Sequence, residues 1–364
     1  MRYVVNVVEP TLTTEAGHCS MVVHSLCTAG AGLPIRLWTA RGARLPTLER
    51  LDLDIRRHFA RRLRKLQAVL LYRQLLRESG AIVVPTAGRF DLQALDLVAK
   101  GRIPPKKVFL YFHRLQLTPH KEAVLRRLAD RQPNVELLGT TDAIERKLRE
   151  VGFPNTGVVL PFPVLADAGA APGRAFRHVL VAGAARADKG FRQVVDFVMY
   201  LQQAQSTIPI TIQISGDHYD RYDEQTRRDL DRLRSLRYPP LTLLPETLIS
   251  DQYAAMFRGA ICLQPYDRKE YADKISSITL EALSAAAPVV PSANTWMAHT
   301  IQRFDAGVVV PDAFPATLER AVLAVIHGYA RYSGNAHAAS AELRTRQTWV
   351  PIIDLLRRHT AGVR

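Results

Sequence analysis

Two acidic residues in the second half of the chain have a spacing that suits sugar recognition. Asp273 and Glu281 flank the seven residues "KISSITL", and Ser276 or Ser277 can supply the hydroxyl N-cap of a helix that carries Glu281 in its second turn. If the loop of Asp273 folds over the helix N-terminus, both carboxylates and several free N–H groups face one site, where they suit paired sugar hydroxyls. The alternative is a loop acid and a glutamate paired with a neighbouring cation.

Two glycine-containing loops have the composition of phosphate sites. Arg186 and Lys189 follow the apolar run "HVLVAGA" and precede Gly190 and a predicted helix, so two cations stand at the mouth of a strand. Gly17, in "EAGHCS", precedes another helix and would allow close approach of a phosphate to its N-terminus. The alternatives are a solvated turn for the first loop and an ordinary strand–helix connection for the second.

Short apolar runs alternate with helical patterns along the whole chain, which predicts parallel sheets covered on both faces. The segment "ADAGAAPGRA" (166–175) divides the runs into two sets. We therefore expect an α/β protein with two doubly wound domains, 1–165 and 176–344. As a hypothesis, the last helix, about 345–364, packs back on the first domain. The predicted strands are 3–8, 35–40, 81–85, 107–112, 135–140 and 156–161, then 178–184, 210–216, 241–245, 260–265, 288–292 and 307–311.

Composition limits the function classes. The 364 residues carry a formal net charge of +15, which predicts an anionic partner such as a nucleotide, a nucleic acid or an anionic membrane. The cysteines Cys19, Cys27 and Cys262 have neither metal-site nor disulfide spacing, which favours a reducing compartment. The start "MRYVVNVVEP" is interpreted as a first strand rather than a signal peptide, and no window is apolar enough to span a membrane. We therefore expect a cytoplasmic protein.

Taken together, these motifs resemble the GT-B glycosyltransferases, and within them the large retaining family 4 (glycosyltransferase group 1). That family has a glycine-rich first loop, an Arg-x-x-Lys-Gly motif in its second domain, and a Glu-x7-Glu pattern. Here "RADKG" and "DKISSITLEALSAAAPVV" correspond to the last two, and the similarity covers most of residues 178–311. Two departures stand out, because Asp273 replaces the first Glu and Ala287 replaces a Gly.

The resemblance implies a role for each matching residue of the second domain, which would be the donor-binding domain. Arg186 and Lys189 would bind the diphosphate of a nucleotide diphosphate sugar, most simply a UDP- or GDP-sugar. Glu281 would bind the ribose hydroxyls, and Asp273 would contact the donor sugar. The backbone N–H groups that would face the diphosphate are those around Ser276, Ser277 and Ile278.

The resemblance also implies a role for the first domain, which would bind the acceptor, a glycan or a lipid-linked molecule. Gly17 would line the site, and His113, after the run "LYF", would approach the donor sugar. The implied reaction is hexosyl transfer with retention, used in cell-surface polysaccharide synthesis, with no cofactor and no metal. The Asp-x-Asp sequence "DLD" (52–54) is interpreted as charge at the start of a basic helix rather than as a metal motif.

That basic helix is predicted over residues 55–76. Arg56, Arg57, Arg61, Arg62, Arg64 and Lys65 are assigned to one side, and Ile55, Phe59, Leu63, Leu66 and Leu70 recur at spacings of three and four. Two interpretations remain open. The helix lies on the inner face of an anionic membrane, as a peripheral attachment, or it is an ordinary surface helix whose apolar stripe faces the core.

Other function classes also fit parts of the sequence. The net charge permits a nucleic-acid-binding protein, although the sequence has no recognisable binding module and we expect no nucleic-acid partner. A nucleotide-sugar epimerase or a non-catalytic nucleotide-sugar-binding protein on the same fold is a further alternative. An epimerase would need no acceptor, and a binding protein would turn nothing over.

Overall fold

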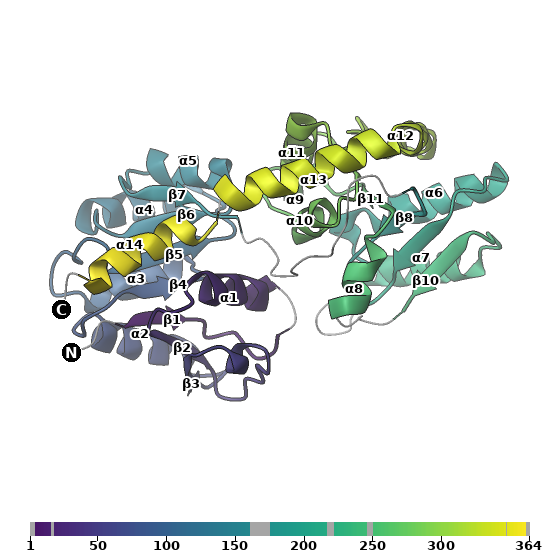
Figure 1. The fold of residues 1–364 in the computed structure, drawn as a ribbon. Helices are drawn as coiled ribbons and strands as arrows, with labels where there is room; N and C mark the ends of the chain where they lie inside the picture. The colour runs from purple at the N-terminus through teal and green to yellow at the C-terminus, as the bar shows by residue number, and fades with distance from the viewer. Residues whose placement is uncertain are drawn as a thin grey trace. The chain divides into compact units, whose positions relative to one another are not determined.

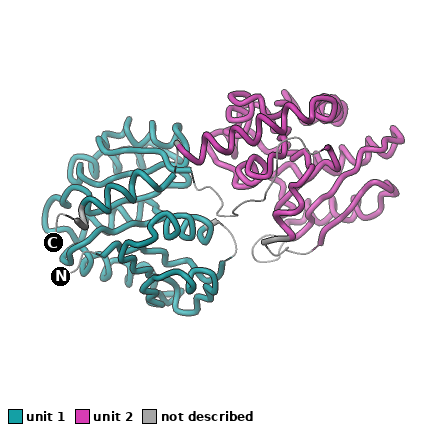
Figure 2. The backbone as a smooth tube through the Cα atoms, viewed as in Figure 1, with its two compact units in different colours: residues 1–164, 347–364 teal, residues 165–346 magenta. Residues whose placement is uncertain are grey.

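A computed structural model describes residues 4–15, 18–160, 175–216, 222–245, 250–346 and 348–361. The chain divides into two compact units, the first made of residues 1–164 and 347–364 and the second of residues 165–346 (Figure 2). Each unit contains one parallel sheet with helices on both faces (Figure 1). The expectation of two doubly wound α/β units is confirmed.

The first unit has a seven-stranded sheet in the order β3-β2-β1-β4-β5-β6-β7. The chain starts in the middle of this sheet and builds outward in both directions, so the strand order reverses between β1 and β4, where open α/β sheets bind ligands. Its strands are β1 (Val5–Val8), β2 (Ile35–Ala40), β3 (Asp54–Phe59), β4 (Ile82–Val84), β5 (Val108–Phe112), β6 (Glu136–Gly139) and β7 (Thr156–Val158).

Helices bury both faces of this first sheet because its central strands β1, β4 and β5 are buried at every residue. One face packs against α1 (His18–Ala29) and the C-terminal α14 (Val350–Ala361). Trp349, the residue before α14, contacts Tyr111 of β5, with the ring centroids 5.0 Å apart. The other face packs against α2 (Arg64–Leu75), α3 (Arg89–Val98), α4 (Pro119–Arg131) and α5 (Asp142–Glu150). The short η1 (Leu48–Arg50) precedes β3.

The second unit repeats the arrangement with five strands in the order β10-β9-β8-β11-β12, so its order reverses between β8 and β11. The strands are β8 (His178–Val181), β9 (Ile210–Gln213), β10 (Leu241–Leu244), β11 (Ala260–Gln264) and β12 (Val289–Pro291). The helices are η2 (Ala187–Lys189), α6 (Phe191–Gln203), α7 (Glu224–Ser235), α8 (Ser250–Met256), α9 (Arg268–Tyr271), α10 (Ser277–Ser284), α11 (Trp296–Phe304), α12 (Pro315–His327) and α13 (Tyr329–Arg346).

The predicted helix over 55–76 is wrong in its first part. Residues Asp54–Phe59 form β3, an edge strand paired in parallel with β2, and the helix begins only at Arg64. Asp54 lies opposite Arg36 and forms a 2.7 Å ion pair with it, which stabilises a strand that carries many charges. Arg56 and Arg57 are therefore strand residues, and they do not share a helix face with the later cations.

Two further expectations are corrected. Asp54 is the first residue of β3 and accepts ion pairs from Arg36 and Arg56, so "DLD" is not the start of a helix. The run 307–311 forms no strand of the sheet, since it contributes only isolated bridges, Val289 to Gly307 and Ser292 to Val310. Among the described residues, no helix is long and apolar enough to cross a membrane.

Candidate functional site

Gly183 brings together two segments that are about ninety residues apart in the sequence. It follows β8 with a φ of 88°, and its N–H donates a 2.7 Å hydrogen bond to the side-chain oxygen of Gln213. A Cβ atom at this position would lie 2.5 Å from Nζ of Lys189 and 2.7 Å from Cδ1 of Ile278. The absent side chain therefore leaves the space in which the lysine amine meets the first turn of α10.

A second glycine holds Lys189 at this position. Gly190 has a left-handed φ of 70°, and a Cβ there would lie 2.0 Å from the carbonyl oxygen of Pro265, the residue after β11. The N–H of Asp267 also donates a 3.0 Å hydrogen bond to the carbonyl of Asp188. The loops after β8 and β11 are thus joined where the strand order of the second sheet reverses.

Lys189 is half-buried. Burial, reinforced by the nearby charge of Arg186, lowers the pKa of Lys189 to about 8. The amine also lies 6.0 Å from the centroid of the Tyr266 ring, which offers a cation–π contact. A cation held in partly desolvated surroundings interacts more strongly with an anionic ligand than one in water.

Glu281 lies on α10 next to this amine. Burial raises the pKa of Glu281 to about 7, while a hydrogen bond from Tyr253 and the charge of Lys189 act in the opposite direction. The hydroxyl of Tyr253, on α8, donates to Oε2 of Glu281 over 2.7 Å. Among the described residues, Lys189 and Glu281 make no direct ion pair, so each group keeps capacity for a ligand.

The N-terminus of α10 adds backbone donors to the same place. Ser276 is the N-cap, as predicted, and its hydroxyl accepts a 3.4 Å hydrogen bond from the N–H of Thr279. The N–H groups of Ser277 and Ile278 have no hydrogen-bond partner within the described chain. Such first-turn N–H groups attract anions, and the helix dipole adds to the effect.

Gln264 supplies a buried donor beside this helix. The hydroxyl of Thr279 donates a 2.7 Å hydrogen bond to Oε1 of Gln264, at the end of β11. Nε2 of the same side chain is buried and has no partner in the described part of the chain. Buried polar groups are rarely left unpaired, so this amide is a candidate ligand contact that the sequence analysis did not identify.

Arg186 is arranged differently from Lys189. Its guanidinium is exposed and forms two hydrogen bonds with the carboxylate of Asp188, at 2.8 and 2.6 Å. The amine of Lys274 lies 3.9 Å from the same carboxylate and 4.5 Å from the centroid of the Tyr271 ring. Asp188 thus contacts two cations at the rim of the site. Lys274 was not identified from the sequence, although it lies next to Asp273.

The structure distributes the remaining predicted residues over both units. Asp273 is half-buried in the loop between α9 and α10, and it precedes Lys274 and the N-cap Ser276 in the chain. Gly17 lies outside the described residues. His113 belongs to the first unit, where its Nε2 is 2.6 Å from the carbonyl oxygen of Pro85 and therefore carries the proton that it donates. Its ring packs edge-on against Tyr111, with centroids 4.5 Å apart.

The first unit also holds a buried carboxyl at its own point of strand reversal. Glu9, directly after β1, accepts hydrogen bonds from the hydroxyl of Thr86 and from the N–H and hydroxyl of Thr11, the last at 2.5 Å. Burial raises the pKa of Glu9. Sequence reasoning missed this residue, although its position just after an apolar strand was a usable signal.

The described residues contain no cluster of His, Cys, Asp or Glu that could hold a metal ion.

Comparison with known proteins gives structural neighbours but no sequence relative. No protein-family model matches the chain, and no curated protein matches it. Among solved structures, sucrose-phosphate synthase from Thermosynechococcus elongatus aligns with a TM-score of 0.67 at 15% identity, over 100% of this chain and 99% of that one. Anabaena Alr3699/HepE in complex with UDP and glucose aligns with a TM-score of 0.67 at 11% identity, over 99% and 100%.

A third neighbour extends the same pattern. An alpha,alpha-trehalose-phosphate synthase (UDP-forming) from Burkholderia vietnamiensis has a TM-score of 0.62 at 14% identity and aligns over 100% of both chains. The chain has a GT-B fold. At these identities the likeness shows the fold alone, and the activity of a GT-B protein depends on the residues of its site.

Proposed function

We propose that this GT-B protein is a retaining glycosyltransferase of the family 4 type. It would move a hexose-type sugar from a nucleotide diphosphate sugar to a glycan or lipid-linked acceptor, in cell-surface polysaccharide synthesis in the cytoplasm. The observation that carries the proposal is that the Lys189 amine meets the first turn of α10 at Gly183, with the Glu281 carboxyl of the same helix close enough to interact with the amine's charge. A cation, an acceptor of hydroxyl protons and free N–H groups are the contacts that a nucleoside diphosphate requires.

Each group has a distinct role in the proposed reaction. When the bond from the anomeric carbon to the diphosphate breaks, negative charge grows on the leaving oxygen. Lys189 and the N–H groups of Ser277 and Ile278 would stabilise that charge, with Arg186 at the rim. Glu281 would hold the ribose hydroxyls, and no step needs a metal or another cofactor.

The sugar and acceptor contacts complete the proposal. Asp273 would bind the donor sugar, which His113 of the first unit would also approach, and Gly17 would line the site. The transition state would resemble an oxocarbenium ion, and the donor phosphate itself would take the acceptor proton. The neighbour Alr3699/HepE has been solved with UDP and with UDP-glucose, which makes uridine nucleotides the first ligands to test.

The test is a binding screen by thermal shift and calorimetry with UDP, GDP, ADP, TDP and their sugar conjugates, without added metal. A ligand that binds only the folded state raises the melting temperature. We expect one nucleotide to bind, and Lys189→Ala to weaken its binding about 10- to 100-fold through loss of a charge-assisted contact. The matched control is Lys269→Ala, an exposed lysine on α9, which should bind normally.

Product analysis then identifies the reaction. Retention is established when NMR shows that donor and product have the same anomeric configuration. A sugar that changes its configuration without an acceptor would instead identify a nucleotide-sugar epimerase. Binding without turnover of any acceptor would leave a non-catalytic binding protein, and wild-type affinity in a folded Lys189→Ala variant would overturn the site.

A further inference from the structure

Helix α2 has two apolar faces, and only one of them is covered. The side chains that pack on the sheet of the first unit are Ala68, Leu71, Tyr72 and Leu75. On the opposite side, Leu63, Leu66 and Leu70 are 56%, 59% and 57% exposed, at spacings of three and four residues. A surface helix normally carries polar residues in these positions, so this row of leucines is not explained by the fold of the unit.

This finding bears on the two interpretations of the basic segment. The predicted stripe was expected either to face the core or to lie on a membrane. Leu63, which precedes α2 as its N-cap, and Leu66 and Leu70 within the helix do not face the core. That role is taken by Leu71, Tyr72 and Leu75.

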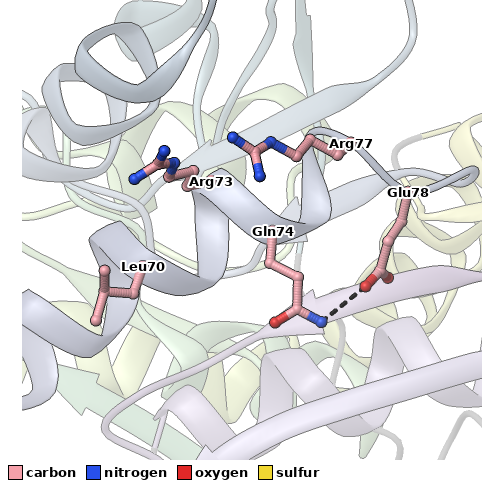
Figure 3. Close-up of a pocket in the computed structure, with 5 residues that line it drawn as sticks. All are labelled: Leu70, Arg73, Gln74, Arg77 and Glu78. Carbon is pink, nitrogen blue, oxygen red and sulfur yellow. Dashed lines mark hydrogen bonds between the residues drawn. The ribbon is translucent and has the colours of Figure 1, made fainter.

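Cations surround the exposed leucines. The segment 61–78 contains a single carboxylate, Glu78, which accepts a 2.7 Å hydrogen bond from Gln74. Figure 3 shows Leu70, Arg73, Gln74 and Arg77 together around an open hollow on this helix. The exposed cations of the segment are Arg61, Arg62, Arg64, Lys65, Arg73 and Arg77. Within the described chain, none of the five arginines forms an ion pair with a carboxylate.

We propose that α2 and the preceding turn dock this protein on an anionic lipid bilayer. The helix would lie in the plane of the interface, with Leu63, Leu66 and Leu70 entering the acyl boundary. The arginines and the lysine would lay their aliphatic stems along the same boundary and meet lipid phosphates with their charged ends. The proposal uses the first unit alone and does not depend on the proposed glycosyltransferase activity.

The charge pattern favours a lipid surface over other occupants. A second copy of the chain would bring six cations against six cations around the leucine row, which repels rather than attracts. A nucleic acid would satisfy the cations but would leave the leucines exposed to water. An anionic bilayer satisfies both, since it offers phosphates and an apolar layer within one helix diameter.

The test is sedimentation with large vesicles of phosphatidylcholine that contain about one third phosphatidylserine, compared with pure phosphatidylcholine. We expect the full-length protein to pellet with the anionic vesicles and to remain soluble with the neutral ones. Arg73→Ala with Arg77→Ala should weaken partitioning roughly 20- to 30-fold, at about fivefold per charge. The double variant Leu66→Asp with Leu70→Asp should abolish binding to the anionic vesicles. The milder double variant Leu66→Ser with Leu70→Ser should weaken the same binding.

The control substitution is Phe314→Asp, which changes a 70% exposed apolar residue of the second unit and should leave vesicle binding unchanged. Circular dichroism verifies that each variant is folded. Vesicle binding that survives both leucine variants would show attraction by charge alone and would overturn the proposal. The proposal would also be overturned if the wild-type protein did not bind anionic vesicles, or if it formed a dimer in solution that dissociates when the leucines are replaced.

Discussion

The hydroxyl of Tyr253 donates a 2.7 Å hydrogen bond to Oε2 of Glu281 and joins α8 to α10 beside the Lys189 amine. The bond favours the ionised carboxyl, whereas burial favours the protonated one, and the balance places the pKa of Glu281 at about 7. The charge of the candidate site therefore changes near neutral pH.

Nucleotide affinity should pass through a maximum with pH. It should rise as Glu281 ionises through about pH 7 and fall again as Lys189 loses its proton above about pH 8. Tyr253→Phe removes a bond that lowers the pKa of Glu281, so the rising limb should move to higher pH, with several-fold weaker binding at pH 7. Calorimetry from pH 6 to 9 measures both limbs. A profile unchanged in Tyr253→Phe would contradict the assignment.

Glu281→Gln should increase stability while it weakens binding. A carboxyl whose pKa is raised from 4.5 to about 7 stabilises the folded state fully below pH 4.5, and this contribution is lost as the pH rises through 7. Glutamine does not ionise and keeps an acceptor for Tyr253. We expect urea unfolding to give a free energy about 1–3 kcal/mol higher than wild type at pH 8, with little difference near pH 4.5. Lower stability at pH 8 would refute this account.

Gly190→Ala should disrupt the loop that carries Lys189. The new Cβ would stand 2.0 Å from the carbonyl of Pro265 at a left-handed φ, so the backbone must move. Gly32→Ala is the matched control, because Gly32 also has a positive φ, 83°, but no atom within 4 Å of the new Cβ. We expect a cost of about 1 kcal/mol for the control and about 3 kcal/mol for Gly190→Ala, together with lost nucleotide binding. Equal costs in thermal unfolding would show that the contact with Pro265 is unimportant.

The sequence was a good guide to elements that are apolar throughout. The runs that became β4, β5 and β11 are buried on both faces, so their composition alone indicates parallel strands. The edge strand β3 was missed because three of its residues, Asp54, Arg56 and Arg57, are charged and the two arginines are exposed, so its conformation depends on pairing with β2. The apolar residues from Ile55 into α2 recur at spacings of three and four, and this periodicity led to the incorrect prediction that the helix begins at residue 55.

The candidate site divides in the same way. Lys189, Glu281 and the N-cap Ser276 could be named from the sequence, because short-range spacing places each of them at a helix start or a strand end. Tyr253, Gln264 and the contact of Gly183 with Ile278 could not, since they join residues far apart in the chain. Whether an apolar stripe is buried is likewise decided by packing, as α2 shows with its leucines outward. Local composition determined the elements and the chemistry that their residues can support. Only tertiary packing decided which groups meet, how deeply they are buried and what charge they carry.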